Sequence, residues 1–176
     1  LVDLLAGGLL PVVGVGSSYQ HASAYPRGVP YVATDNNKLV GLAYEHLIDM
    51  GLPRFALYSM PPAANNKWAR EREAVFRKRM QADGMEPEIF QGLPTFALDW
   101  EPMLDHLVAW LRTLPKPIGI IAVTDSRARQ ILQACIMDGI AVPEEVAIMG
   151  IDDDPLLRML TRIPISSVKQ GTREMG

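Results

Sequence analysis

The sequence predicts an α/β fold with a doubly wound parallel sheet. From residue 55 onward, short apolar runs of strand length alternate with longer stretches in which apolar residues recur at helical spacing. Two of the runs, 118–123 and 146–151, are apolar almost throughout, which is typical of strands that helices cover on both faces. Because crossovers between such strands are right-handed, we expect parallel strands with helices on both sides of the sheet.

The individual elements follow from the same patterns. Strands are predicted at 12–16, 31–34, 55–60, 89–91, 118–123 and 146–151, and helices at 36–50, 67–82, 100–114 and 126–138. Asp35 or Asn36 is expected to cap the start of the first helix, and Gly51 to follow its end. The apolar face of this helix is expected to carry Leu39, Leu42, Ala43, His46, Leu47 and Met50.

Composition limits the classes of function. A chain of 176 residues with 48% apolar residues is long enough for about one domain with a buried core. The formal charge of -3, from 17 basic and 20 acidic residues, does not suit a segment that itself binds nucleic acid. The single cysteine, Cys135, lies on the apolar face of its predicted helix, so we expect an unreactive thiol and a cytoplasmic protein. Asp3, Pro11 and glycines interrupt the apolar segment 1–16, and no basic region precedes it, so neither a membrane span nor a signal peptide is expected.

Acidic residues follow two strands of the predicted sheet. Asp125 comes just after the strand at 118–123, and Asp152 comes directly after the strand at 146–151. Parallel strands point their carboxyl ends to one edge, where ligands bind, so both carboxylates are expected there. The alternative role for Asp125 is a cap for the next helix. Asp152 opens a run of three aspartates, whose mutual repulsion a neighbouring group must offset.

An arginine and a tryptophan are expected at the same edge. Trp68, Arg72, Phe76 and Met80 follow one another at steps of four, so Arg72 shares a helix face with large apolar groups, near the start of the helix. A solvated arginine is the alternative. Trp100 opens the next helix, either as a core residue or as a flat platform for a sugar ring. A guanidinium that faces carboxylates suits a ligand rich in hydroxyls, because each hydroxyl both donates and accepts hydrogen bonds.

Missing motifs exclude several other sites. No third glycine follows Gly14 and Gly16 as in a dinucleotide-binding turn, and the sequence has no phosphate-binding loop. The three histidines, His21, His46 and His106, are scattered, so we expect no metal site and no cofactor. No serine lies in the turn that carries the nucleophile of many hydrolases.

Several segments resemble the effector lobe of lactose-repressor-type regulators and periplasmic sugar-binding proteins. In the order and spacing of that family they are 32–36, His46 with Leu47 and Gly51, 69–72 with Phe76, Asp99 with Trp100, 124–126, 150–153 and 167–170. The segments 68–73, 91–93 and 119–125 resemble the xylose-responsive branch of these regulators. The resemblance covers nearly the whole chain and implies a periplasmic-binding-protein-like fold, in which two lobes close on a sugar.

The resemblance also implies a domain organisation. Residues 1–33 correspond to the end of a first lobe and a crossover, 34–169 to the second lobe, and 170–176 to the return crossover. Most of the first lobe and the DNA-binding domain are expected outside this segment. Lactose-type relatives carry the DNA-binding domain before the sensor, whereas the xylose branch resembles arabinose-type regulators in carrying it afterwards.

Relatives contact their sugar at the positions of Arg72, Trp100 and Asp152. Thr124 stands where some relatives carry a sugar-binding asparagine, and Asp125 follows it. The candidate ligand-binding residues are therefore Trp68, Arg72, Trp100, Thr124, Asp125 and Asp152.

The expected function is that of a non-catalytic sensor. The resemblance implies a monosaccharide effector, with D-xylose first, and a homodimer that binds operator DNA through a domain outside this segment. A secreted sugar-binding protein of a transporter is the alternative on the same scaffold, and a signal peptide would distinguish it. An enzyme that processes glycosides with Asp125 and Asp152 ranks third, because it needs a narrow carboxyl separation and nothing near either residue in the sequence would raise its pKa.

Overall fold

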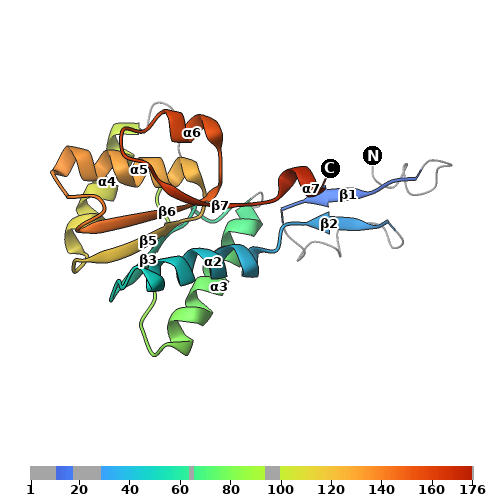
Figure 1. Cartoon of the computed structure of the whole chain (residues 1–176), viewed down its shortest axis with the longest axis horizontal. Helices are drawn as coiled ribbons and strands as arrows, with labels where there is room; N and C mark the ends of the chain where they lie inside the picture. Colours follow the sequence, from blue (N-terminus) through green and yellow to red (C-terminus); the bar gives the residue numbers. More distant parts are fainter. Residues whose placement is uncertain (1–10, 18–28, 64–65, 94–99, 176) are drawn as a thin grey trace.

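Two parallel sheets form the framework of the chain. The computed structural model describes residues 11–17, 29–63, 66–93 and 100–175. In these ranges a five-stranded sheet lies in a large lobe, and a two-stranded sheet projects from one end of that lobe (Figure 1). The chain passes between them before helix α2 and again after strand β7 (Figure 1).

The strands of the large sheet lie in the order β4-β3-β5-β6-β7, and every neighbouring pair is parallel. Their bounds are Phe55–Tyr58 (β3), Glu88–Phe90 (β4), Ile118–Ala122 (β5), Val146–Asp152 (β6) and Ser166–Lys169 (β7). The small sheet pairs β1 (Gly14–Gly16) with β2 (Tyr31–Ala33). The helices are α2 (Asn36–Asp49), α3 (Lys67–Ala82), α4 (Trp100–Thr113), α5 (Asp125–Asp138), α6 (Pro155–Met159) and α7 (Thr172–Met175).

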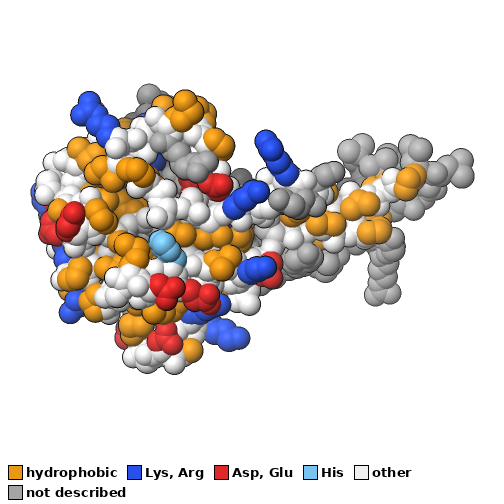
Figure 2. Space-filling model, in the orientation of Figure 1, with side chains coloured by type: hydrophobic (Ala, Val, Ile, Leu, Met, Phe, Trp, Pro, Cys, Tyr) orange, Lys and Arg blue, Asp and Glu red, His pale blue; other side chains and the backbone are white. Residues whose placement is uncertain are grey.

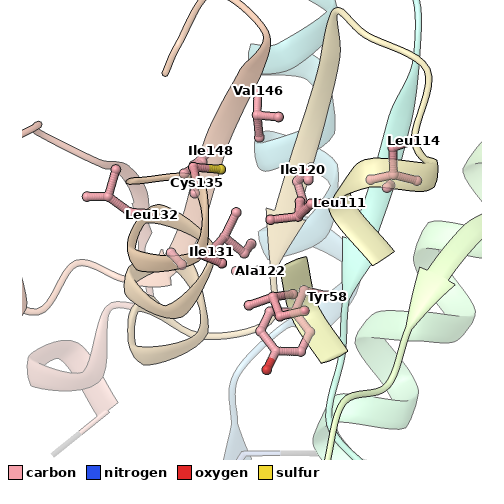
Figure 3. Packing of buried hydrophobic residues seen from close by; sticks show 14 of the residues in the cluster. Tyr58, Leu111, Leu114, Ile120, Ala122, Ile131, Leu132, Cys135, Val146 and Ile148 are labelled. Atoms are coloured by element: carbon pink, nitrogen blue, oxygen red, sulfur yellow. The ribbon is translucent and has the colours of Figure 1, made fainter. Parts of the chain in front are cut away.

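Helices cover both faces of the large sheet, which confirms the doubly wound arrangement. On one face Leu57 and Ile121 pack with residues of α2 and α3, and on the other Tyr58 and Ile120 pack with residues of α4 and α5. Figure 3 shows side chains of the second core around β5. Successive residues of one strand enter opposite cores, and for this reason β5 and β6 are apolar almost throughout.

The predicted strands and helices are confirmed, and their ends agree to within two residues. Two elements of the large lobe were missed, namely α6 with five residues and β7 with four. Elements this short show too little periodicity for a pattern to be recognised. Both matter for the site, because they follow β6 and complete the carboxyl edge of the sheet.

The buried face of α2 differs from the predicted one. Leu42 and Met50 are 46% and 51% exposed, and His46 is exposed as well. The apolar residues that α2 buries are Leu39, Val40, Ala43, Tyr44 and Leu47. The ring of Tyr44 lies 4.8 Å from that of Phe55 and fills the space between the sheet and α3. Burying this large ring turns the row of Leu42, His46 and Met50 towards solvent.

The two-stranded sheet leaves apolar side chains uncovered. Val13 and Val15, in and beside β1, are each 56% exposed, and Figure 2 shows apolar side chains along this narrow part of the molecule. Within the described ranges, no helix has both the length and the apolar character needed to cross a bilayer.

Cys135 gives a test of the packing of the α4 and α5 core. The residue is fully buried, and burial raises the pKa of its thiol to about 12. We expect a thiol reagent to leave the folded chain unmodified near pH 8 and to react with one thiol per chain in denaturant. Absorbance of the released chromophore measures both reactions. Fast labelling of the folded chain would contradict the described packing.

Candidate functional site

Polar side chains gather at the carboxyl edge of the large sheet, where β5 and β6 end and α3 begins. In Figure 1 this edge of the large lobe faces the two-stranded sheet. Arg72 reaches the edge from the second turn of α3, and Asp152 is the last residue of β6. The two side chains are close enough for Arg72 to lower the pKa of Asp152. The structure thus brings together the arginine and the aspartate that the sequence places at one edge.

Arg72 is a buried cation held by neutral groups. Its side chain is 1% exposed, its Nε donates to Asn36 Oδ1 at 2.9 Å, and its Nη1 donates to the carbonyl of Val123. The guanidinium lies over the ring of Trp68, with 4.8 Å between Cζ and the ring centroid. Burial lowers the pKa of Arg72 to about 10, against the attraction of Asp152 and Glu71, so the group is still positive at neutral pH.

The described residues leave some donors of the Arg72 guanidinium without an acceptor. An arginine has five N–H donors, and the described residues accept hydrogen bonds from Nε and Nη1 only. No carboxylate among the described residues forms an ion pair with Arg72, although Asp152 and Glu71 act on it electrostatically. A buried cation with open donors beside an acidic group is suited to bind a ligand that accepts and donates at adjacent atoms.

Asp152 carries the complementary charge. Gln170 donates from Nε2 to Oδ1, and the backbone N–H of Asp125 lies 3.4 Å from Oδ2. Burial raises the pKa of Asp152 to about 6, although Arg72 opposes the shift. The backbone turns sharply here, with φ of 150° at Asp152 and 57° at Asp153. Such conformations cost about 1–3 kcal/mol per residue and are common at ligand sites.

Asp125 holds the loops of this edge together. Its Oδ1 accepts from the hydroxyl of Ser167 at 2.5 Å, and its Oδ2 accepts from the backbone N–H of Asp154 at 2.8 Å. The side chain is 5% exposed. A Cβ on Gly150 would lie 2.2 Å from Oδ1, so the close approach of β6 to this carboxylate requires glycine. The carboxylate thus joins the loop after β6 to strand β7.

Thr124 is the cap of α5. Its Oγ1 accepts from the backbone N–H of Arg127 at 3.3 Å. The capping role that was the alternative for Asp125 therefore belongs to the preceding residue. Whether Thr124 or Asp125 also contacts a ligand stays a prediction.

Family models match the chain at both ends. The model of the periplasmic binding protein-like domain matches residues 44–176, and that of the XylR N-terminal domain matches residues 1–37. The chain belongs to the periplasmic binding protein-like family.

Similar proteins of this family include transcription regulators. The xylose operon regulatory protein of Escherichia coli K12 is 47% identical over 167 residues, which are 95% of this chain and 42% of that protein. The protein of the same name from Haemophilus influenzae is 43% identical over 175 residues, or 99% and 45%. The solved structure of the xylose-binding transcription activator XylR matches with a TM-score of 0.88 and 46% identity, over 98% of this chain and 45% of that one. The chain thus spans less than half of the length of these relatives.

The two candidate tryptophans of this binding-protein-like lobe lie on opposite faces of the sheet. Trp68 packs against the α2 and α3 core and against Arg72, whereas Trp100 packs against the α4 and α5 core. Both are half-buried. Because α3 and α4 each begin at the carboxyl edge, each ring lies near that edge, and contact of either ring with a ligand stays a prediction.

Sequence patterns missed three polar residues of the edge. Asn36 accepts from Arg72, and Gln170 donates to Asp152. Ser59, directly after β3, is fully buried, and in the described part of the chain its hydroxyl is the buried side-chain group without a hydrogen-bond partner. A polar residue next to the end of an element looks in a sequence like a cap or a loop residue, so no periodic signal marks these three.

The role of Asp125 can be tested by unfolding. Asp125→Ala removes the acceptors of Ser167 and Asp154, and hydrogen bonds to a buried charge contribute about 1.5–3 kcal/mol each. We expect the free energy of unfolding to fall by about 3 kcal/mol, measured by urea denaturation. Asp105→Ala, at an exposed position of α4, is the matched control and should change it by less than about 0.5 kcal/mol. Equal effects of the two variants would contradict the described loop contacts.

Proposed function

We propose that this chain is the sugar-sensing part of a cytoplasmic transcription regulator and that its effector is D-xylose. The observation that supports this most is the buried Arg72 with open donors beside Asp152 at the carboxyl edge of a parallel sheet. The names of the relatives favour xylose among the sugars. The whole regulator, including a DNA-binding domain and a homodimer, belongs to the same proposal.

The proposed complex assigns complementary roles to the two charged groups. Arg72 donates from Nη2 to sugar hydroxyl or ring oxygens, and Asp152 accepts from sugar hydroxyls. Trp68 and Trp100 offer apolar rings to the C–H face of the sugar, and Thr124 offers a hydroxyl. Asp125 contributes to the site indirectly, because it holds the loop around Asp152 in place.

The proposed switch is a closure of two lobes. Residues 34–169 form the second lobe, 1–33 end the first lobe and its crossover, and 170–176 return to the first lobe. The exposed apolar side chains of the two-stranded sheet support this division, because a sheet of two strands needs further cover to be stable. Sugar that binds between the lobes stabilises the closed state by its differential affinity, and this is what changes DNA binding.

Catalysis is not part of the proposal. One premise against it was wrong, because burial does raise the pKa of Asp152, to about 6. The partner that a glycosidase would need is Asp125, however, and both of its oxygens accept hydrogen bonds within the chain. Binding of the sugar without turnover is the expected outcome, and release of a chromophore from an aryl xyloside would contradict it.

The arginine provides the first test of sugar binding. We expect Arg72→Ala and Arg72→Lys to weaken D-xylose binding roughly 10- to 100-fold, because a charged hydrogen bond contributes about 1.5–3 kcal/mol and lysine lacks the planar fork. Calorimetric titration of the full-length gene product measures the affinity, and thermal unfolding verifies that each variant is folded. Arg70→Ala removes an exposed arginine from the same helix and should leave the affinity unchanged. No heat with D-xylose or other pentoses would refute the sugar proposal.

The pH dependence of binding provides a second test. Burial raises the pKa of Asp152 to about 6 in the chain without sugar, and hydroxyl donors of a sugar stabilise the ionised form, which lowers this pKa in the complex. The affinity should therefore be full above about pH 6 and fall roughly tenfold per pH unit below it, until the pKa of the complex is reached. Calorimetry at several pH values measures the profile. Asp152→Asn should bind weakly at every pH, and an unchanged midpoint in this variant would assign the titration to another group.

A further inference from the structure

We propose that Asn36 is the positioning residue of the sugar-binding arginine and that it joins Arg72 to the end of β1 in the two-stranded sheet. This inference rests on the proposed role of Arg72 in sugar binding. Asn36 does not contact the sugar in this proposal. Its role is to set the direction in which the remaining N–H donors of the guanidinium point.

Asn36 lies at the centre of a small hydrogen-bond network. Its side chain is 5% exposed at the start of α2. Its Oδ1 accepts from Arg72 Nε at 2.9 Å, and its Nδ2 donates to Glu71 Oε2 at 2.6 Å and to the carbonyl of Ser17 at 2.8 Å. Both donors and one acceptor site of the amide are thus used by groups from two other parts of the chain, α3 and the end of β1.

The partners allow only one orientation of the amide. Nδ2 faces two oxygens that can only accept hydrogen bonds, and Oδ1 faces a guanidinium that can only donate. A flipped amide would oppose like groups at every contact. Nor does helix capping require this side chain, because Asp35 caps α2 by accepting from the backbone N–H of Lys38 at 3.0 Å.

Two contacts fix the plane of the guanidinium. The carbonyl of Val123 accepts a hydrogen bond from Nη1, and Oδ1 of Asn36 accepts one from Nε. Val123 continues β5, and its backbone N–H donates to Tyr58 of the neighbouring strand, so that contact is set by the rigid sheet. The contact of Asn36 depends instead on a side chain that is itself held from elsewhere. Of the two contacts that orient Nη2, the one with Asn36 is therefore the one that can change.

The same amide reaches the end of β1 in the two-stranded sheet. Ser17 follows β1, and its carbonyl accepts from both Asn36 Nδ2 and Thr34 Oγ1, the latter at 3.0 Å. A shift of β1 relative to α2 would strain these bonds and with them the contact to Arg72. Movement of β1 and the direction of the Arg72 guanidinium are thereby coupled through one side chain.

The principal test is Asn36→Asp in the full-length protein. The variant keeps the shape of the side chain but turns an oxygen towards Ser17 and Glu71, so we expect D-xylose to bind at least tenfold more weakly. Asn37→Asp introduces the same charge at the exposed neighbouring position and should change the affinity less than twofold. Glu71→Gln supplies an amide that can donate to the carboxylate introduced by Asn36→Asp, so the double variant should regain part of the lost affinity.

A cycle with Arg72→Lys separates positioning from a general effect on folding. Lysine has no Nε–H for Asn36 to hold, so Asn36→Asp should weaken binding much less in that background than in the wild type. An equal weakening in both backgrounds, or unchanged binding by Asn36→Asp alone, would overturn the inference. Asn36→Ala, which adds no charge, should also bind more weakly, and it serves if Asn36→Asp does not fold. Absence of binding by the wild type would instead refute the proposed function.

Discussion

The site depends on the burial of one arginine that forms no ion pair with the described residues. Taking a guanidinium out of water is costly, and most buried arginines meet this cost through a carboxylate in contact. Arg72 meets it through an amide, a backbone carbonyl and an indole ring. The arrangement holds the charge in place and leaves donors open, which a tight ion pair would not do. The start of α2, the end of β5 and the first turn of α3 supply the groups that hold this charge.

The acidic side of the edge is built on the same principle. Asp152 forms no ion pair within the part of the chain that the structure describes, and burial raises its pKa to about 6. Asp125 has a structural role instead, because its two oxygens accept hydrogen bonds from the loop after β6 and from β7. Two aspartates of similar position in the sequence thus have different tasks, and burial and hydrogen-bond partners distinguish them.

The sequence predicted most of the fold and only part of the site. Strands such as β5 and β6 are buried on both faces, so their composition reveals them, and Arg72 stands out because it interrupts an apolar row at steps of four. Asn36 and Gln170 could not be recognised, since their roles depend on partners 36 and 18 residues away. The predicted face of α2 was wrong for Leu42, His46 and Met50, because Tyr44 is buried instead. Its ring packs against Phe55, and its hydroxyl donates to Asp83.

Both crossings of the chain end at the charged pair. On the way into the large lobe, the chain reaches Asn36 at the start of α2, and this residue holds Arg72 and also donates to the carbonyl of Ser17. On the way out, Gln170 directly follows β7 and holds Asp152. A ligand that engages the two charges therefore acts within two hydrogen bonds of each crossing. Under the proposed function, the sugar can therefore change the relative orientation of the two lobes without a path through the packed core.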